Sequence, residues 1–177
     1  PLILGAHTFT SRLLTGTGRF SSLARTTEAL SASGSELCTL AVRRIDLNET
    51  ASSALLEALP AGMKVLPNTA GCMTAQEALR VARLAREALE TDLVKLEILA
   101  DPLTLYPNNA ETVRCAQLLI DDGFTVLPYC GDDPVVCREL AAIGCAAVMP
   151  LAAPIGSGLG VVNPHVLRLI IDQVHVP

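Results

Sequence analysis

Two charged residues interrupt a short apolar run and are the first candidates for chemistry. Lys95 and Glu97 lie two positions apart within residues 93–100, a stretch with the length and composition of a buried strand. Side chains alternate along a strand, so both charges point to one face. A buried charge is costly unless it is paired or does chemistry. We therefore predict that Lys95 and Glu97 are catalytic, with an interior ion pair of structural role as the alternative.

The choice of lysine supports a chemical role. Eleven of the thirteen basic residues are arginine, and the two lysines are Lys64 and Lys95. Arginine stays protonated, whereas a desolvated lysine can lose its proton and attack a carbonyl carbon. Because Lys64 stands at the entrance of a predicted strand, we expect Lys95 to be the residue that forms an imine. Glu97, on the same face, is placed to move protons.

The elements that must position this pair form one repeated unit. Strand, loop and helix alternate six times, with about 20 to 30 residues between strands. The predicted strands cover residues 11–15, 37–42, 63–66, 93–100, 124–128 and 145–151. The predicted helices cover residues 21–33, 49–59, 74–89 and 109–121, with two more that start at Asp133-Pro134 and Asn163-Pro164. The Thr74-Ala75-Gln76-Glu77 stretch has the pattern of a capping box.

This alternation fits two architectures, an open doubly wound sheet and a (β/α)8 barrel, and both place active sites at the carboxyl ends of strands. A charged pair within one strand suits a barrel interior better. A complete barrel usually needs about 250 residues, and residues 174–177 resemble the start of a seventh strand. We therefore predict a single α/β domain, residues 1–177, with about six βα units of a (β/α)8 TIM-type barrel. Its first and sixth strands should have open edges, and Lys95 should be less enclosed than in a closed barrel.

Composition argues against several classes of partner. The net charge is −5, without blocks of like charge, which argues against nucleic acid and anionic membranes as main partners. No apolar run approaches the ~20 residues that span a bilayer. The six cysteines show no C-x-x-C pair and no metal-ligand spacing, and the three histidines are scattered, so we expect no metal site. A reducing cytoplasm fits this cysteine usage best.

Two glycine-rich stretches do not predict a cofactor. Residues 16–21 carry two glycines of a dinucleotide fingerprint but have serine where the third should stand. Residues 155–160 lack the Gly-Lys-Ser/Thr ending of a P-loop. Glycines at the carboxyl end of a strand can still offer backbone amides to an anion, although a loop that needs unusual dihedral angles is an equal alternative. We predict no bound cofactor.

Seven short stretches, in this order and spacing, resemble bacterial thiazole synthase of thiamin biosynthesis over essentially the whole chain. They are residues 14–18 (LTGTG), 39–44 (TLAVRR), 66–71 (LPNTAG), 94–97 (VKLE), 127–129 (LPY), 147–151 (AVMPL) and 154–157 (PIGS). The resemblance implies a (β/α)8 barrel that builds the thiazole phosphate ring. It implies three substrates: 1-deoxy-D-xylulose 5-phosphate, dehydroglycine, and sulfur from the C-terminal thiocarboxylate of a ubiquitin-like sulfur-carrier protein. We also expect a homo-oligomer.

The resemblance assigns roles to individual residues. It implies that Lys95 forms the imine with the ketose phosphate, that Glu97 acts as acid and base, and that the Gly156 amide contacts substrate, with Ser157 beside it. In that family the seventh strand continues into an acidic residue and Ala-Gly, and the eighth ends in Asn-Thr; the sequence here contains neither segment. We therefore expect the polypeptide to continue past Pro177, or a neighbouring chain to fill the gap.

Two other functions share parts of this pattern. A Schiff-base aldolase barrel would also use Lys95, but it would cleave a carbon–carbon bond and need no carrier protein. A non-catalytic barrel that serves as an assembly partner would keep Lys95 and Glu97 as a structural pair. Trapping with borohydride separates the non-catalytic barrel from the two enzymes, and a thiocarboxylated carrier separates the enzymes from each other.

Overall fold

A curled, parallel, six-stranded sheet forms the centre of the molecule. The computed structural model describes residues 1–18, 20–44 and 50–177. The strands pair in sequence order and are β3 (Leu14–Gly16), β4 (Leu37–Ala41), β5 (Lys64–Asn68), β6 (Leu93–Leu96), β7 (Thr125–Cys130) and β8 (Met149–Pro150). Within these described ranges β3 and β8 do not pair with each other, so the sheet is an open half-barrel. The predicted α/β barrel class and the open edges are confirmed.

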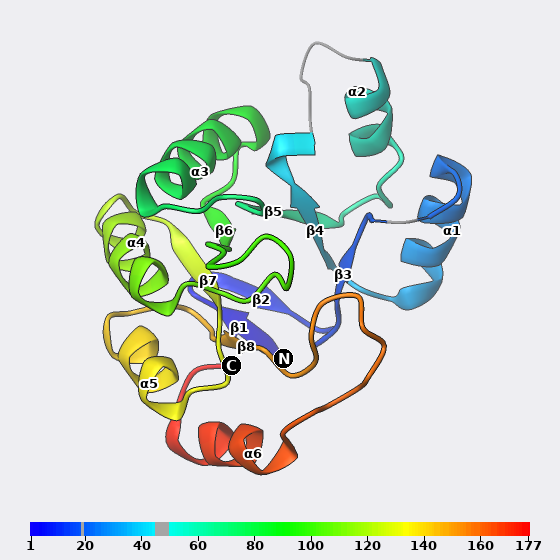
Figure 1. Cartoon of the computed structure of the whole chain (residues 1–177). Helices are drawn as coiled ribbons and strands as arrows, with labels where there is room; N and C mark the ends of the chain where they lie inside the picture. Colours follow the sequence, from blue (N-terminus) through cyan, green and yellow to red (C-terminus); the bar gives the residue numbers. More distant parts are fainter. Residues whose placement is uncertain (19, 45–49) are drawn as a thin grey trace.

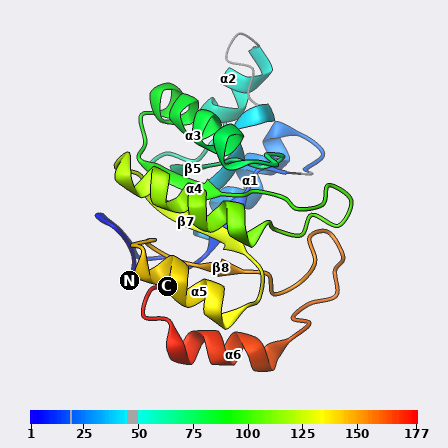
Figure 2. The same ribbon diagram turned by 60° about the vertical axis from the view of Figure 1, so that its left-hand side comes forward.

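Helices cover the convex side of the sheet, as Figures 1 and 2 show. They are α1 (Leu23–Ser33), α2 (Thr50–Glu57), α3 (Ala75–Leu89), α4 (Asn109–Asp121), α5 (Pro134–Ala142) and α6 (Pro164–Gln173), with a short 3-10 helix, η1 (Val42–Arg44), after β4. The main core lies between these helices and the strands. Val94, Leu96 and Ile98 of the central segment are fully buried in it, which fixes the orientation of the residues between them.

Local sequence signals set the helix ends. The Thr74 hydroxyl accepts from the Glu77 amide at 3.3 Å, and the Glu77 carboxylate accepts from the Met73 amide at 2.8 Å. The expected capping box therefore forms, with the carboxylate one residue further back than the threonine. Gly34 ends α1 in the left-handed region at φ 64°.

The predicted boundaries differ from the observed ones by more than two residues at three strands. The first strand, expected at 11–15, is β3, and the fourth, expected at 93–100, ends at Leu96. The sixth, expected at 145–151, is assigned only at Met149–Pro150, although hydrogen bonds from Ala146 to Val126 and from Leu151 to Cys130 continue the pairing. Residues 174–177, expected to begin a seventh strand, are not assigned as a strand, although the Val148 amide donates to the Pro177 carbonyl at 2.9 Å. Glu49, the expected start of the second helix, lies outside the described residues.

An N-terminal hairpin, which the sequence pattern did not predict, covers the amino ends of the parallel strands. Strands β1 (Leu2–Leu4) and β2 (His7–Phe9) pair antiparallel around Gly5, whose φ is 57°. Three hairpin side chains pack against the first layer of the sheet interior; this cluster contains Leu2, Leu4, Phe9, Leu37, Leu66, Leu93, Leu127 and Ala147. Strands of three residues are too short to show periodicity, so the pattern gave no signal.

Polar contacts fasten the hairpin to the sheet. His7 Nε2 lies 2.8 Å from Asp92 Oδ1, and Lys64 Nζ lies 3.2 Å from His7 Nδ1. The Thr125 hydroxyl donates to Asp92 Oδ2 at 2.6 Å. Burial acts to raise the pKa of Asp92, but the hydrogen bonds from Thr125 and His7 outweigh it, so the pKa lies below its ordinary value. Lys64 stands at the amino end of β5, as predicted.

We expect Asp92→Asn to weaken this attachment in a pH-dependent way. A carboxyl whose pKa is lowered by folding stabilises the protein above its unfolded pKa of about 3.9, and this stabilisation disappears as pH falls through the folded value. The Asp92 side chain is 41 % exposed, so solvent screens the interaction and the loss at pH 7 should be about 0.5 kcal/mol.

Urea unfolding at pH 7 and pH 2 measures this effect. Asp92→Asn should be less stable than the wild type at pH 7 and equal to it at pH 2. Asp121→Asn, at an exposed position on α4, is the matched control and should match the wild type at both values. A stability difference for Asp92→Asn that is the same at both pH values would contradict the lowered pKa.

Candidate active site

The structure brings Lys95 and Glu97 into direct contact on the concave face of the sheet. Lys95 Nζ lies 2.7 Å from Glu97 Oε1, and the side chains are 21 % and 10 % exposed. Val94 and Leu96 pack against the helices on the other side, so the predicted alternation of the strand is confirmed. The pair is therefore held close, mostly desolvated, and within reach of a single small molecule.

The position of the pair along the sheet follows from the register. Leu93 belongs to the apolar cluster beneath the hairpin, and Lys95 is the next residue of β6 on that face. The loops after β6 and β8 lie on the side of the sheet opposite the hairpin (Figures 1 and 2). Lys95 and Glu97 thus lie toward the carboxyl ends of the strands, where barrel active sites occur.

Asn68 is a neighbour that the sequence analysis did not single out. It is the parallel partner of Lys95 on β5 and is 7 % exposed. Its amide nitrogen donates to the Thr39 hydroxyl at 2.9 Å, and its side-chain oxygen accepts from the Ala70 amide at 3.2 Å. A polar residue two positions after the predicted strand at residues 63–66 was the available signal. Its hydrogen bonds connect β4 with the turn that follows β5.

Tyr129 and the loop after β6 form a wall beside the pair. The Tyr129 hydroxyl donates to the Leu105 carbonyl at 3.1 Å, and Leu105 adopts a left-handed backbone at φ 60°. The side chains of Leu99, Leu105, Tyr129 and Leu151 pack together. Burial, helped by the negative charge of Glu97, raises the pKa of Tyr129 to about 12. The phenol is therefore a neutral donor at physiological pH, and its hydrogen bond holds this loop in place.

Gly156 and Ser157 lie in an exposed turn after β8. The Ser157 amide and hydroxyl both donate to the Pro154 carbonyl, at 3.1 and 2.7 Å, and Gly156 has a φ of 76°. Residues 154–157 form a four-residue turn whose third residue has a positive φ, and glycine adopts this backbone conformation without strain. In the part of the chain that the structure describes, no hydrogen bond joins this turn to Lys95 or Glu97. The contact of Gly156 and Ser157 with substrate stays a prediction.

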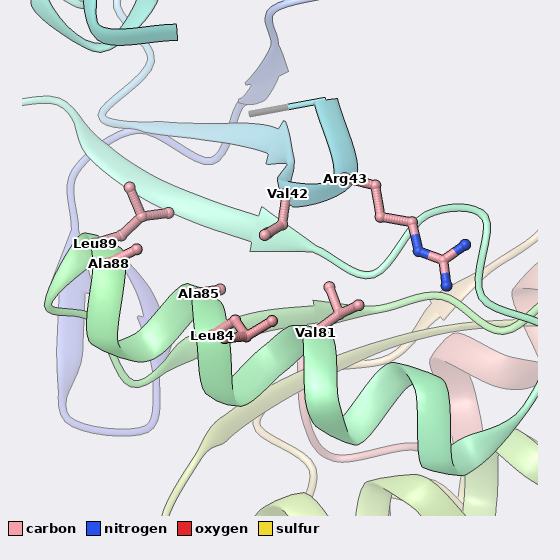
Figure 3. Close-up of a pocket in the computed structure, with 7 residues that line it drawn as sticks. All are labelled: Val42, Arg43, Val81, Leu84, Ala85, Ala88 and Leu89. Carbon is pink, nitrogen blue, oxygen red and sulfur yellow. The ribbon is translucent and has the colours of Figure 1, made fainter. Parts of the chain in front are cut away.

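A separate cavity of about 220 Å³ lies outside the curl, between α3 and the end of β4 (Figure 3). Its lining is apolar except for one arginine and consists of Val42, Arg43, Val81, Leu84, Ala85, Ala88 and Leu89. The Arg43 guanidinium donates to the Gly71 carbonyl at 3.0 Å. The cavity contains none of the predicted site residues, so it is not where the chemistry is expected.

The described part of the chain offers neither a metal-binding cluster nor a membrane-spanning helix. No three His, Cys, Asp or Glu side chains of these ranges group in a way that could hold a metal ion. No helix there combines the length and the apolar character needed to cross a membrane. All six cysteines are free and buried, as expected for residues that act as small hydrophobes.

The fold and the site together define a class of protein. A curled parallel sheet with its helices outside, and with a lysine and a carboxylate meeting toward the carboxyl ends of the strands, is the arrangement of a β/α-barrel enzyme. Residues 3–177 match the family model described as "Thiazole biosynthesis protein ThiG". The chain belongs to the thiazole synthase family, a family of thiamin-biosynthesis enzymes.

Individual relatives agree with the family match. The thiazole synthase of Sorangium cellulosum is 54% identical over 99% of this chain and 68% of its own length. The thiazole synthase of Geobacter metallireducens is 51% identical over the same shares. The crystal structure of the Amycolatopsis orientalis BexX/CysO complex is similar in fold, with a TM-score of 0.86 and 31% identity over 99% of this chain and 72% of that chain.

Proposed function

We propose that this protein makes thiazole phosphate by sulfur transfer, through an imine between Lys95 and 1-deoxy-D-xylulose 5-phosphate. Dehydroglycine and a thiocarboxylated carrier protein supply the other ring atoms. The contact of Lys95 Nζ with Glu97 Oε1 at 2.7 Å, in a chain of this family, carries the proposal. A half-buried lysine beside a carboxylate has both the nucleophile and the proton acceptor that imine formation needs.

The pair accounts for the first steps of such a reaction. A lysine attacks only as the free amine, and the Glu97 carboxylate is close enough to accept its proton. The amine then adds to the ketone carbon, Glu97 returns its proton to the departing hydroxyl group, which leaves as water, and a cationic imine remains. This cation draws electrons from the adjacent carbon, which can therefore lose a proton to Glu97. The carbonyl group then migrates along the sugar, and its carbon becomes open to attack by a sulfur nucleophile.

The comparison with a solved complex supports the choice of sulfur donor. BexX was crystallised with CysO, and the same kind of partner, a small sulfur-carrier protein, is what we propose for this chain. The thiocarboxylate must approach from the carboxyl ends of the strands, because the hairpin cluster fills the amino ends. That approach passes the turn at Gly156, where the structure leaves open space: a side chain added there would meet no atom within 4 Å.

Gly156 is proposed to bind substrate through its backbone amide, with Ser157 beside it as a further substrate-binding residue. Glycines in a left-handed turn at the carboxyl end of a strand can present amides to an anionic group. The open space around Gly156 lets a ligand approach the backbone closely.

We further propose that residues 1–177 act as one domain and that the protein works in the cytoplasm. We also propose that it forms a homo-oligomer, which light scattering can detect.

Reconstitution tests the proposed function. The purified protein is mixed with the ketose phosphate, dehydroglycine and either thiocarboxylated carrier or the same carrier with an ordinary C-terminal carboxylate. Thiazole phosphate should form only with the thiocarboxylate. Cleavage of the sugar without carrier would support an aldolase, and absence of a borohydride-stable adduct would show that Lys95 and Glu97 are a structural pair.

A further inference from the structure

Thr69 is attached to the backbone on both sides of the proposed catalytic pair. It follows β5 directly and its exposed fraction is 0 %. Its hydroxyl donates to the Glu97 carbonyl at 2.8 Å and accepts from the Glu97 amide at 2.8 Å. Its own amide donates to the Lys95 carbonyl at 3.2 Å. One side chain thus satisfies both backbone groups of Glu97, which a hydroxyl can do because it donates and accepts together.

A turn explains why a side chain is needed at this point. In a regular parallel sheet, the Thr69 carbonyl would accept a hydrogen bond from the next strand. Here it accepts instead from the Cys72 amide, at 3.1 Å. Gly71 makes this turn possible with a φ of 85°. Regular pairing resumes beyond it, where the Leu99 amide donates to the Cys72 carbonyl at 2.9 Å. The chain therefore bulges between Thr69 and Cys72, opposite Glu97, and the hydroxyl replaces the missing ladder partner.

We infer that Thr69 is a positioning residue for proton transfer by Glu97. Irregularities of this kind beside a strand redirect a neighbouring side chain. The Glu97 carboxylate must stay within hydrogen-bond reach of the protons that it moves, yet its backbone has left β6, which ends at Leu96. The Thr69 hydroxyl fixes that backbone and, through it, the carboxylate. The inference rests on the proposed function, because it assigns Thr69 to the same proton-transfer step.

A graded series of substitutions tests the hydroxyl. Thr69→Val keeps the branched shape without the hydrogen bonds, Thr69→Cys keeps a weak donor and acceptor, and Thr69→Ser keeps the hydroxyl. Turnover should fall about 10- to 100-fold in Thr69→Val, since a displacement of about 1 Å has effects of this size. Thr69→Cys should be intermediate and Thr69→Ser near the wild type. The KM for the sugar phosphate should change little, and the imine should remain detectable.

Thr112→Val is the matched control. Thr112 is also 0 % exposed, and in the described part of the chain its hydroxyl has no hydrogen-bond partner. This variant makes the same chemical change in an equally buried place, so its turnover should equal that of the wild type. Thermal unfolding of every variant shows whether it folds. If Thr69→Val does not fold, the comparison of Thr69→Cys with Thr69→Ser decides, and equal turnover of these two would overturn the inference.

The double variant distinguishes positioning from general structural support. If Thr69 acts through Glu97, then Glu97→Gln with Thr69→Val should be no slower than Glu97→Gln alone, because the group being positioned is already gone. Losses that multiply would overturn the inference while the proposed function stands. Full turnover of Glu97→Gln would overturn the proton-transfer role of Glu97 and, with it, the inference about Thr69. Impaired Glu97→Gln together with unimpaired Thr69→Val would overturn only the role of Thr69.

Discussion

Lys95→Ala and Lys95→Arg are both expected to lose turnover by about 10³-fold or more. Alanine removes the amine, and the guanidinium of arginine stays protonated and cannot attack a carbonyl. Arginine keeps a positive charge beside Glu97, whose side chain is 10 % exposed, so this variant should fold. The loss then reports on chemistry rather than on the ion pair. Steady-state turnover and circular dichroism of the purified variants provide the measurement.

Lys64→Arg is the matched control for this prediction. Lys64 is the other lysine of the sequence, and it lies at the amino end of β5, 3.2 Å from His7. It is exposed and far from the carboxyl ends of the strands, so turnover should be unchanged. A borohydride-trapped adduct that persists in Lys95→Ala would show that another amine forms the imine.

Glu97→Gln is expected to lower turnover on the order of 10²-fold while the imine still forms to a detectable level. Glutamine keeps the shape and a hydrogen-bonding oxygen near Lys95, but it cannot hold and return a proton. The alternative is an ion pair that serves folding, and breaking a buried pair typically destabilises by about 3–5 kcal/mol. Turnover and urea unfolding, measured on the same samples, separate the two. Lower stability with full turnover would make the structural interpretation correct.

The parts of the site that strand geometry determines could be predicted from the sequence. Lys95 and Glu97 meet on one face because the alternation of side chains continues one residue past the end of β6 at Leu96, and Val94 and Leu96 pack on the other face. The helix starts were equally local: Thr74 caps α3 through an amide only three residues away. Such features need no knowledge of the rest of the chain.

The missed features depend on contacts between distant residues. Thr69 and Glu97 are 28 residues apart, and only the paired strands show that the hydroxyl replaces a ladder hydrogen bond. Another such contact is the Glu111 carboxylate on α4, which accepts from the Ala75 amide at the start of α3 at 2.7 Å. The periodicity of apolar residues along a sequence does not indicate which distant residues form hydrogen bonds with each other. The N-terminal hairpin was missed for a different reason, since its three-residue strands carry almost no pattern.

The measurement that tests the proposal most directly is the location of the trapped sugar. The wild-type protein is incubated with 1-deoxy-D-xylulose 5-phosphate, reduced with borohydride, digested and analysed by mass spectrometry. The added mass should lie on the peptide that contains Lys95, and inorganic phosphate in excess should reduce it by competing for the sugar-phosphate site. An adduct on Lys64 or on the N-terminal amine, with Lys95 unmodified, would contradict the imine mechanism proposed here.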